Sequence, residues 1–135
     1  MKRGLLIVLL FTVVFMANRI PSHAQSIPNT VLNSGAFEAE FHFDVFYSIV
    51  NCDGATILLL TAFNESGAKT DVGFDLEFSD ALGNKQSFKV PIFKSKLSEM
   101  LQSSCTSDEH SFLKFAINNS FDFKTITGNI KFYSK

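Results

Sequence analysis

The stretch from Phe37 to Asn51, FEAEFHFDVFYSIVN, decides the fold class of this chain. Every odd-numbered position from Phe37 to Ile49 is apolar or aromatic. The positions between them include charged or ionisable residues, namely Glu38, Glu40, His42 and Asp44. Because successive side chains of a strand point to opposite faces of the sheet, this period of two predicts one long strand that is buried on its odd face.

Further apolar or alternating stretches follow this strand, separated by residues typical of turns. They cover residues 55–63, 72–79, 88–93, 113–117 and 121–132. The first of them, ATILLLTAF, is apolar at nearly every position, which predicts a central strand that is buried on both faces. Pro91 has no N–H to donate, so its strand is expected at a sheet edge or bent at that residue.

These patterns predict an all-β fold. We expect a single-domain antiparallel β-sandwich of immunoglobulin-like architecture with about six or seven strands, and a small β-barrel is the alternative. The period changes at residues 94–104, where Leu97, Met100 and Leu101 are spaced i, i+3 and i+4 and Ser95 can act as an N-cap. We therefore also predict one short helix near residues 95–104.

The N-terminus has the layout of an export signal. Lys2 and Arg3 precede an apolar segment, and small residues, Ser22 and Ala24, stand before Gln25. This layout predicts a signal peptide over residues 1–24, cleaved after export, rather than a membrane anchor, because the apolar segment is shorter than the roughly 20 residues of a membrane span. Residues 25–35 are then a leader, flexible or laid along a sheet edge, and residues 36–135 form the β-sandwich domain. We expect a secreted or periplasmic protein with no membrane span after cleavage.

Cys52 and Cys105 are the two cysteines of the chain. In an oxidising compartment we expect them to form a disulfide. Two free thiols or a metal-bound pair are the alternatives, although a zinc site would need further ligands in a recognisable spacing.

The composition argues against several functional classes. Once the signal is removed, the chain has no arginine and an excess of acidic residues, which disfavours nucleic acid and anionic membranes as partners. No phosphate-binding glycine motif is present, and the few histidines give no nucleophile with a positioned base. We therefore expect a protein that is not an enzyme and uses no cofactor.

Two sets of residues are candidates for a binding site. Phe46, Phe93 and Phe112 are out of phase with their neighbours and would form an exposed apolar patch for a partner if only one side of the sheet is covered; if both sides are covered, they belong to the core. Glu40, His42 and Asp44 lie on one face of the predicted first strand and could contribute to a metal site if a neighbouring strand adds a ligand. The alternative for this second set is an ordinary solvated strand face.

The sequence therefore supports three functional hypotheses. The first is an exported module that binds another protein as an accessory factor of the cell envelope or extracellular space. The second is a carrier that holds a lipid or other apolar ligand in a cavity lined by Phe41, Phe43, Phe74 and Phe78. The third is a divalent-metal-binding module. The sequons at Asn64 and Asn118 matter only in a secretory pathway that attaches glycans.

Overall fold

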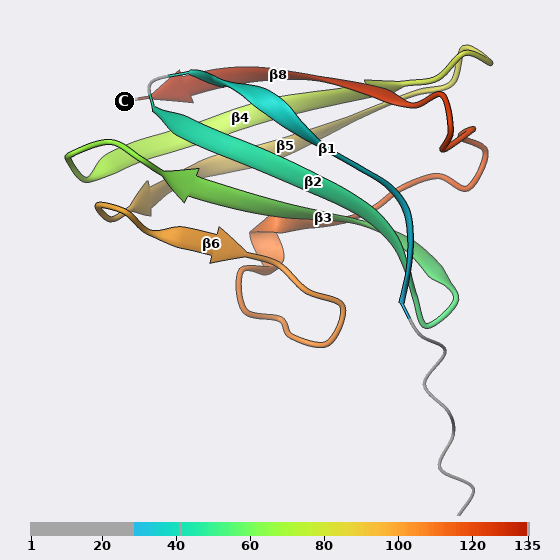
Figure 1. Cartoon of the computed structure of the whole chain (residues 1–135), viewed down its shortest axis with the longest axis horizontal. Helices are drawn as coiled ribbons and strands as arrows, with labels where there is room; N and C mark the ends of the chain where they lie inside the picture. Colours follow the sequence, from blue (N-terminus) through green and yellow to red (C-terminus); the bar gives the residue numbers. More distant parts are fainter. Residues whose placement is uncertain (1–28, 41, 135) are drawn as a thin grey trace, which may run out of the picture.

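The alternating stretches fold into two antiparallel sheets that pack face to face (Figure 1). The computed structural model describes residues 29–40 and 42–134, with the backbone alone at 38–40 and 134. Sheet A contains β1 (Thr30–Glu40), β2 (Phe43–Cys52), β3 (Ala55–Asn64), β6 (Met100–Gln102) and β7 (Lys114–Ala116). Sheet B contains β4 (Thr70–Ser79), β5 (Lys85–Ser95) and β8 (Thr127–Ser134). A 3₁₀ turn, η1 (Ser111–Leu113), precedes β7.

The predicted all-β sandwich is confirmed, and the sheets do not close into a barrel. The strand order is β1-β2-β3-β6 in sheet A, with β7 also paired to β3, and β5-β4-β8 in sheet B. Immunoglobulin constant domains place their strands in the order ABED and CFG. The present chain shares the two-layer architecture, but its first three strands form a meander within one sheet.

The opening stretch is two strands rather than the single long strand that we predicted. β1 ends at Glu40 and β2 begins at Phe43, so the chain reverses direction between them. His42 takes the left-handed conformation that this reversal requires, at φ 58°. The odd face stays inward through the reversal, since Phe37 pairs with Val45 and both are buried. A period of two indicates which face of a strand is buried, but it does not show where the chain reverses direction. His42 is also not one of the residues that usually indicate a tight turn in a sequence.

The N-terminal leader has a structure over part of its length. Thr30 to Gly35 form the first half of β1, which is an edge strand of sheet A. This agrees with the expectation that the leader lies along a sheet edge. The predicted signal peptide, residues 1–24, lies outside the described residues, as does Phe41. In the segments that the structure describes, no helix has the length and apolar character needed to cross a membrane.

The helix predicted near residues 95–104 is wrong. Residues 96–99 form a turn with Ser98 at φ 53°, and β6 follows and pairs with β3. The buried side chain of Asn64 holds this turn, donating to the carbonyl oxygens of Lys96 at 2.9 Å and Ala68 at 3.1 Å. Pairing along the edge of β3 therefore overrides the local helical spacing. With the chain reversal and β6, the described residues contain eight strands, beyond the expected number.

β6 and β7 divide the edge of β3 between them. Thr61 to Phe63 pair with β6, and Ile57 to Leu59 pair with β7. The buried hydroxyl of Ser103 fills the gap: it accepts from the Leu60 N–H at 3.0 Å and lies within hydrogen-bond distance of the carbonyl oxygens of Leu60, at 3.0 Å, and Leu113, at 2.9 Å. The chain between the two short strands leaves the sheet as a loop, and the predicted disulfide between Cys52 and Cys105 is present and ties this loop to the end of β2.

The core lies between the sheets and is rich in phenylalanine. Its largest fully buried apolar side chains come from both layers: Phe43, Val45, Ile49, Leu58, Leu60, Val72, Phe74, Leu76, Phe78, Val90 and Leu113. Phe43 of sheet A packs against Phe132 of sheet B with ring centroids 6.3 Å apart, and Phe74 packs against Phe132 at 5.6 Å. The inner faces thus join through aromatic contacts.

Candidate functional site: the outer face of sheet A

The outer face of sheet A is apolar where strand alternation would normally place charged residues. On β3, Leu58, Leu60 and Ala62 point into the core and are buried, so the residues between them point outward. Six large apolar side chains on this face are exposed or half-buried: Val31, Phe46, Ile57, Leu59, Phe63 and Met100; Val50, which pairs with Val31 and Ile57 on the same face, is buried. We call these six residues the apolar outer face.

Cross-strand pairing brings these residues together from distant parts of the sequence. Met100 of β6 lies opposite Phe63 of β3, and Phe46 of β2 lies opposite Thr61. Val31 and Met100 are each 58% exposed and Phe46 is 43% exposed, whereas Ile57, Leu59 and Phe63 are half-buried. Side chains that are accessible and contiguous in this way form the kind of surface used for partners.

Charge is scarce across the strand pairs of this face. In the outward-facing rows of β2, β3, β6 and β7, the charged residues are Asp44 and Lys114. The Lys114 ammonium donates to the carbonyl oxygen of Cys105 at 3.2 Å and lies 4.0 Å from the Asp108 carboxylate, so it leans toward the disulfide loop. The centre of the face therefore presents apolar groups and the hydroxyls of Ser48 and Thr61.

The three phenylalanines predicted as a partner site occupy different places. Phe46 is exposed on the apolar outer face. Phe93 of β5 and Phe112 of η1 are half-buried and contact each other, with ring centroids 5.1 Å apart. The ring centroid of Phe93 also lies 6.0 Å from that of Phe43 in the core. The structure thus does not bring Phe46 together with Phe93 and Phe112.

The candidate metal residues are divided by the chain reversal. His42 lies exposed in the turn, Asp44 lies on the outer face of β2, and the Glu40 side chain is outside the described residues. Three acidic residues of β4 could supply a further ligand, namely Asp71, Asp75 and Glu77, but they belong to sheet B and lie on the opposite side of the sandwich. Within the described side chains, no group of three or more His, Cys, Asp and Glu residues could hold a metal ion. The metal set stays a prediction.

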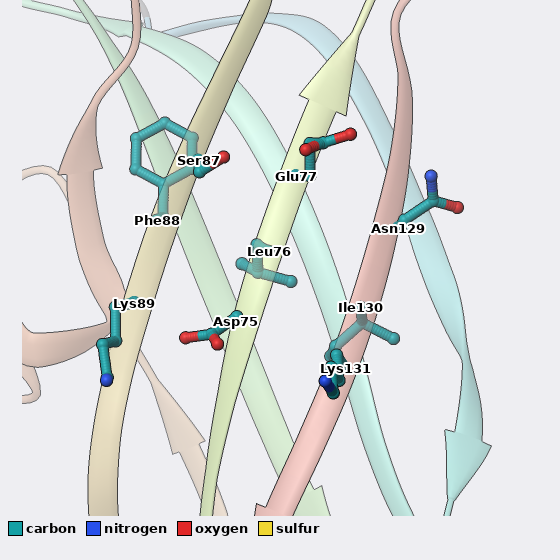
Figure 2. A pocket seen from close by; sticks show the side chains of 9 residues that line it. All are labelled: Asp75, Leu76, Glu77, Ser87, Phe88, Lys89, Asn129, Ile130 and Lys131. Atoms are coloured by element: carbon teal, nitrogen blue, oxygen red, sulfur yellow. The ribbon is translucent and has the colours of Figure 1, made fainter.

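The outer face of sheet B has the opposite character and forms an open depression (Figure 2). Asp75 of β4 lies between Lys89 of β5 and Lys131 of β8, and the next row places Glu77 between Ser87 and Asn129. Charges of both signs alternate across the strands, as on a surface that faces water. The charges of this face therefore lie opposite one another on its own strands.

A tyrosine closes one end of the sheet B face. The ring of Tyr133 covers Gly73, where an added Cβ would stand 2.5 Å from the ring, and its hydroxyl donates to the carbonyl oxygen of Val90 at 2.7 Å. Burial, and after it the negative charge of Asp75, raises the pKa of Tyr133. β5 has an extra residue opposite Gly73, and this irregularity lies at Pro91, as its missing N–H predicted.

A hydrogen-bonded cluster joins two loops at one end of sheet B. The Asp80 carboxylate accepts from the backbone N–H groups of Leu82, Asn84 and Asp122 and from the side-chain amide of Asn84, at 2.8 to 3.0 Å. Partial desolvation acts to raise the pKa of Asp80, but the donated hydrogen bonds outweigh it and lower that pKa overall. Its acceptor capacity is used within the protein, so the role of Asp80 is to hold the loops together.

Sequence reasoning found Phe46 but missed the rest of the apolar outer face. The helical spacing of residues 95–104 places Met100 in a helix, and the continuous apolar run of residues 55–63 predicts a strand covered on both sides, whereas the structure places these residues on the outer face. The sequence does indicate it, because residues 55–63 are apolar at both odd and even positions, which is unusual for a strand with one face toward water.

Comparisons of the chain with protein-family models, curated proteins and solved structures find no match.

Proposed function

We propose that this chain is a small exported, non-enzymatic β-sandwich that binds another protein through the apolar outer face of sheet A. The observation that carries the proposal is this face itself, with Phe46 and Met100 strongly exposed beside half-buried Leu59 and Phe63. Large exposed apolar patches on soluble domains mark interaction sites, because leaving them in water costs free energy that a partner recovers.

Other features of the molecule support an extracellular or periplasmic site of action. The disulfide between Cys52 and Cys105 is typical of proteins that fold in an oxidising compartment. The signal-like layout of residues 1–24 supports export of the chain. We therefore place the binding event in the cell envelope or the extracellular space.

The interior favours a binding module over a carrier. The rings of Phe43, Phe74 and Phe78, which would line a cargo cavity, contact other aromatic rings at centroid distances from 5.1 to 6.4 Å. Aromatic contacts at this spacing are those of a close-packed core.

Site-specific photo-crosslinking tests the proposal. A benzophenone amino acid is introduced in place of Phe46 in one variant and in place of Ser87, on the outer face of sheet B, in a matched control. Irradiation of cells that produce each variant should give a discrete crosslinked protein from position 46 and none from position 87. Equal crosslinking at both positions, or none at position 46, would show that the apolar outer face is not a binding site.

A further inference from the structure

The outer face of sheet B has an aromatic floor at Gly73. Tyr133 of β8 lies opposite Gly73, and its hydroxyl donates to the carbonyl oxygen of Val90 on β5 at 2.7 Å, so its ring reaches across β4. A Cβ on Gly73 would stand 2.5 Å from this ring, which therefore takes the space that a side chain would fill. The ring is half-buried and lines an open depression of about 460 Å³, so part of it stays accessible from outside the sheet.

Charged side chains of both signs flank the Tyr133 ring along the strands. Asp71 lies opposite Lys94 on one side of the ring, and Asp75 lies opposite Lys89 on the other. Within residues 29–40 and 42–134, the side chains of Asp71, Asp75 and Lys94 form no hydrogen bond or ion pair. The Lys89 ammonium lies 5.7 Å from the centroid of the ring. These polar groups are therefore available to a ligand that rests on the ring.

The balance of charge beside the ring indicates a neutral ligand. Two carboxylates and two ammonium groups surround it, and Lys131 and Glu77 add one charge of each sign further along the same face. A polyanion or a polycation would gain no net attraction from such a surface. A hydroxyl group is both a donor and an acceptor, so it can accept from an ammonium and donate to the carboxylate opposite. A ligand with many hydroxyls uses both members of each pair.

The ring of Tyr133 adds the second requirement, a flat apolar contact. A pyranose sugar has hydroxyls around its rim and carbon-bound hydrogens on its faces, and these hydrogens pack against the negative face of an aromatic ring. A wholly apolar ligand would leave the flanking charges without partners, which costs free energy. The combination of one aromatic ring with polar groups on both sides therefore fits a sugar.

The site is long enough for more than one sugar. A second open depression, formed by neighbouring residues of β4, β5 and β8, meets the first at Lys89 (Figure 2). From Asp71 to Glu77 the outward positions of β4 extend over roughly 20 Å, at about 3.3 Å per residue. An open trough of this length suits an extended chain of sugars better than a single enclosed one.

We propose that the outer face of sheet B binds a neutral polysaccharide chain, with one sugar stacked on Tyr133 and its hydroxyls bonded to Asp71 and Lys94 on one side and to Asp75 and Lys89 on the other. This site lies on the opposite side of the sandwich from the apolar outer face, so it does not depend on the proposed function. It also agrees with the polar character of sheet B, because sugar hydroxyls make the same kinds of hydrogen bond as the water that they replace.

Native affinity electrophoresis tests the site. The disulfide-bonded protein is run through gels that each contain one soluble neutral polysaccharide, namely mixed-linkage β-glucan, arabinoxylan, galactomannan or dextran, and through a gel that contains the anionic polysaccharide alginate. We expect retardation in at least one neutral gel, with a Kd between about 10 µM and 1 mM, and none in alginate. Retardation in no neutral gel, or in alginate alone, would overturn the proposal.

Substitutions then place the binding on sheet B. Tyr133→Ala should weaken binding by at least about 10-fold, whereas Tyr133→Phe keeps the ring and should retain most of the affinity. Asp71→Ala should weaken binding by about 5- to 10-fold, and it replaces Tyr133→Ala if circular dichroism shows that this variant does not fold. Phe46→Ala, on the apolar outer face, is the matched control and should bind as the wild type does. Unchanged binding in the folded sheet B variants, or loss of binding in Phe46→Ala, would refute the site.

The length of the bound chain is tested separately. Isothermal titration with oligosaccharides cut from the polysaccharide that binds should show an affinity that rises with chain length until the trough is filled. An affinity that is already maximal for a disaccharide would confine binding to the depression at Tyr133 and reject an extended chain. The crosslinking from position 46 is independent of these measurements, so either site can fail without the other.

Discussion

The outer face of sheet A carries phenylalanine, isoleucine, leucine and methionine in rows where the outer face of sheet B carries lysine, aspartate and glutamate. Both faces are built from antiparallel strands with the same inward alternation, and both rest on one aromatic core. Sheet B balances its charges internally, with Asp75 between two lysines and Tyr133 covering Gly73. Sheet A leaves apolar groups at its surface.

The comparison shows which outer face of the sandwich lacks the polar residues expected of a surface in contact with water. A sheet face turned permanently toward water is expected to be polar, and sheet B meets that expectation. The same rule makes the apolar rows of sheet A informative, because the fold does not require them: the inward residues of β2 and β3 already supply the core. These rows are the basis of the proposed contact with a partner.

The largest expected effect is the difference in stability between substitutions on the inner and outer faces of β2. Phe43 is 1% exposed and Phe46 is 43% exposed, although only two residues separate them on β2. Phe43→Ala should lower the free energy of unfolding by about 3 to 5 kcal/mol, because it leaves a cavity among aromatic rings. Phe46→Ala should cost less than about 1 kcal/mol in the monomer. Urea unfolding of dilute protein measures both, and similar losses would show that Phe46 belongs to the core.

The second prediction concerns the margin of sheet A, which the short strands β6 and β7 complete. Replacing both Cys52 and Cys105 by Ala removes the only described covalent tie on that margin and should cost about 2 to 4 kcal/mol, since the bridge spans 53 residues in sequence. Hydrogen exchange should accelerate first in β6, β7 and the loop between them. Uniform acceleration over both sheets would mean that the bridge acts on the whole domain instead, and chemical reduction of the wild type provides a matched control.

The sequence predicted the layers of this fold better than its connections. Alternation placed Phe37, Phe43, Phe74 and Phe78 in the core correctly, because burial on one face is written into every second residue. It missed the reversal at His42, since a left-handed turn residue other than Gly or Asn leaves little trace in a sequence. It also missed β6, because the pairing of Met100 to Gln102 with β3 is a tertiary contact that local spacing does not encode.

The candidate site was predictable only in part for a related reason. Phe46 was recognisable because it interrupts a polar face. Ile57 and Leu59 were recognisable as apolar but not as residues of an outer face, since that depends on whether a second layer covers β3. Phe93 and Phe112 were indistinguishable from Phe46 in the sequence, and only the packing of β5 against η1 places them between the sheets.

The third prediction tests whether the ring of Tyr133 covers Gly73 on the outer face of sheet B. Gly73→Ala would bring a Cβ to 2.5 Å from the Tyr133 ring and 3.0 Å from the backbone nitrogen of Ile92, so the ring must move away. We expect a loss of about 1 to 3 kcal/mol in the free energy of unfolding. Tyr133→Ala in the same background should recover part of this loss, which a thermodynamic cycle from denaturant titrations would reveal. Additive losses would indicate that the strain lies in the backbone of β5 and that Tyr133 does not cover the face.

The fourth and smallest effect is electrostatic and belongs to the end of sheet B. The pKa of Asp80 is lower in the folded protein than in the unfolded chain, because donated hydrogen bonds favour the carboxylate over the partial desolvation that opposes it. The carboxylate therefore stabilises the fold fully above the unfolded-state pKa, and this contribution is lost as the pH falls through the folded-state pKa.

Stability measured by urea unfolding should thus decline below about pH 4 in the wild type, and the decline should be shallower in Asp80→Asn, which has no carboxylate to protonate. Asn84→Ala removes one donor to Asp80 and should move the folded-state pKa back toward its ordinary value, narrowing the pH interval of the decline. Ser87→Ala, in the same hairpin but outside the cluster, is the control. An Asp80→Asn profile parallel to the wild type would assign the acid sensitivity to other carboxylates. It would also mean that the Asp80 carboxylate does not stabilise this end of sheet B, so the charged end of sheet B and the nearly uncharged rows of sheet A would not differ in this respect.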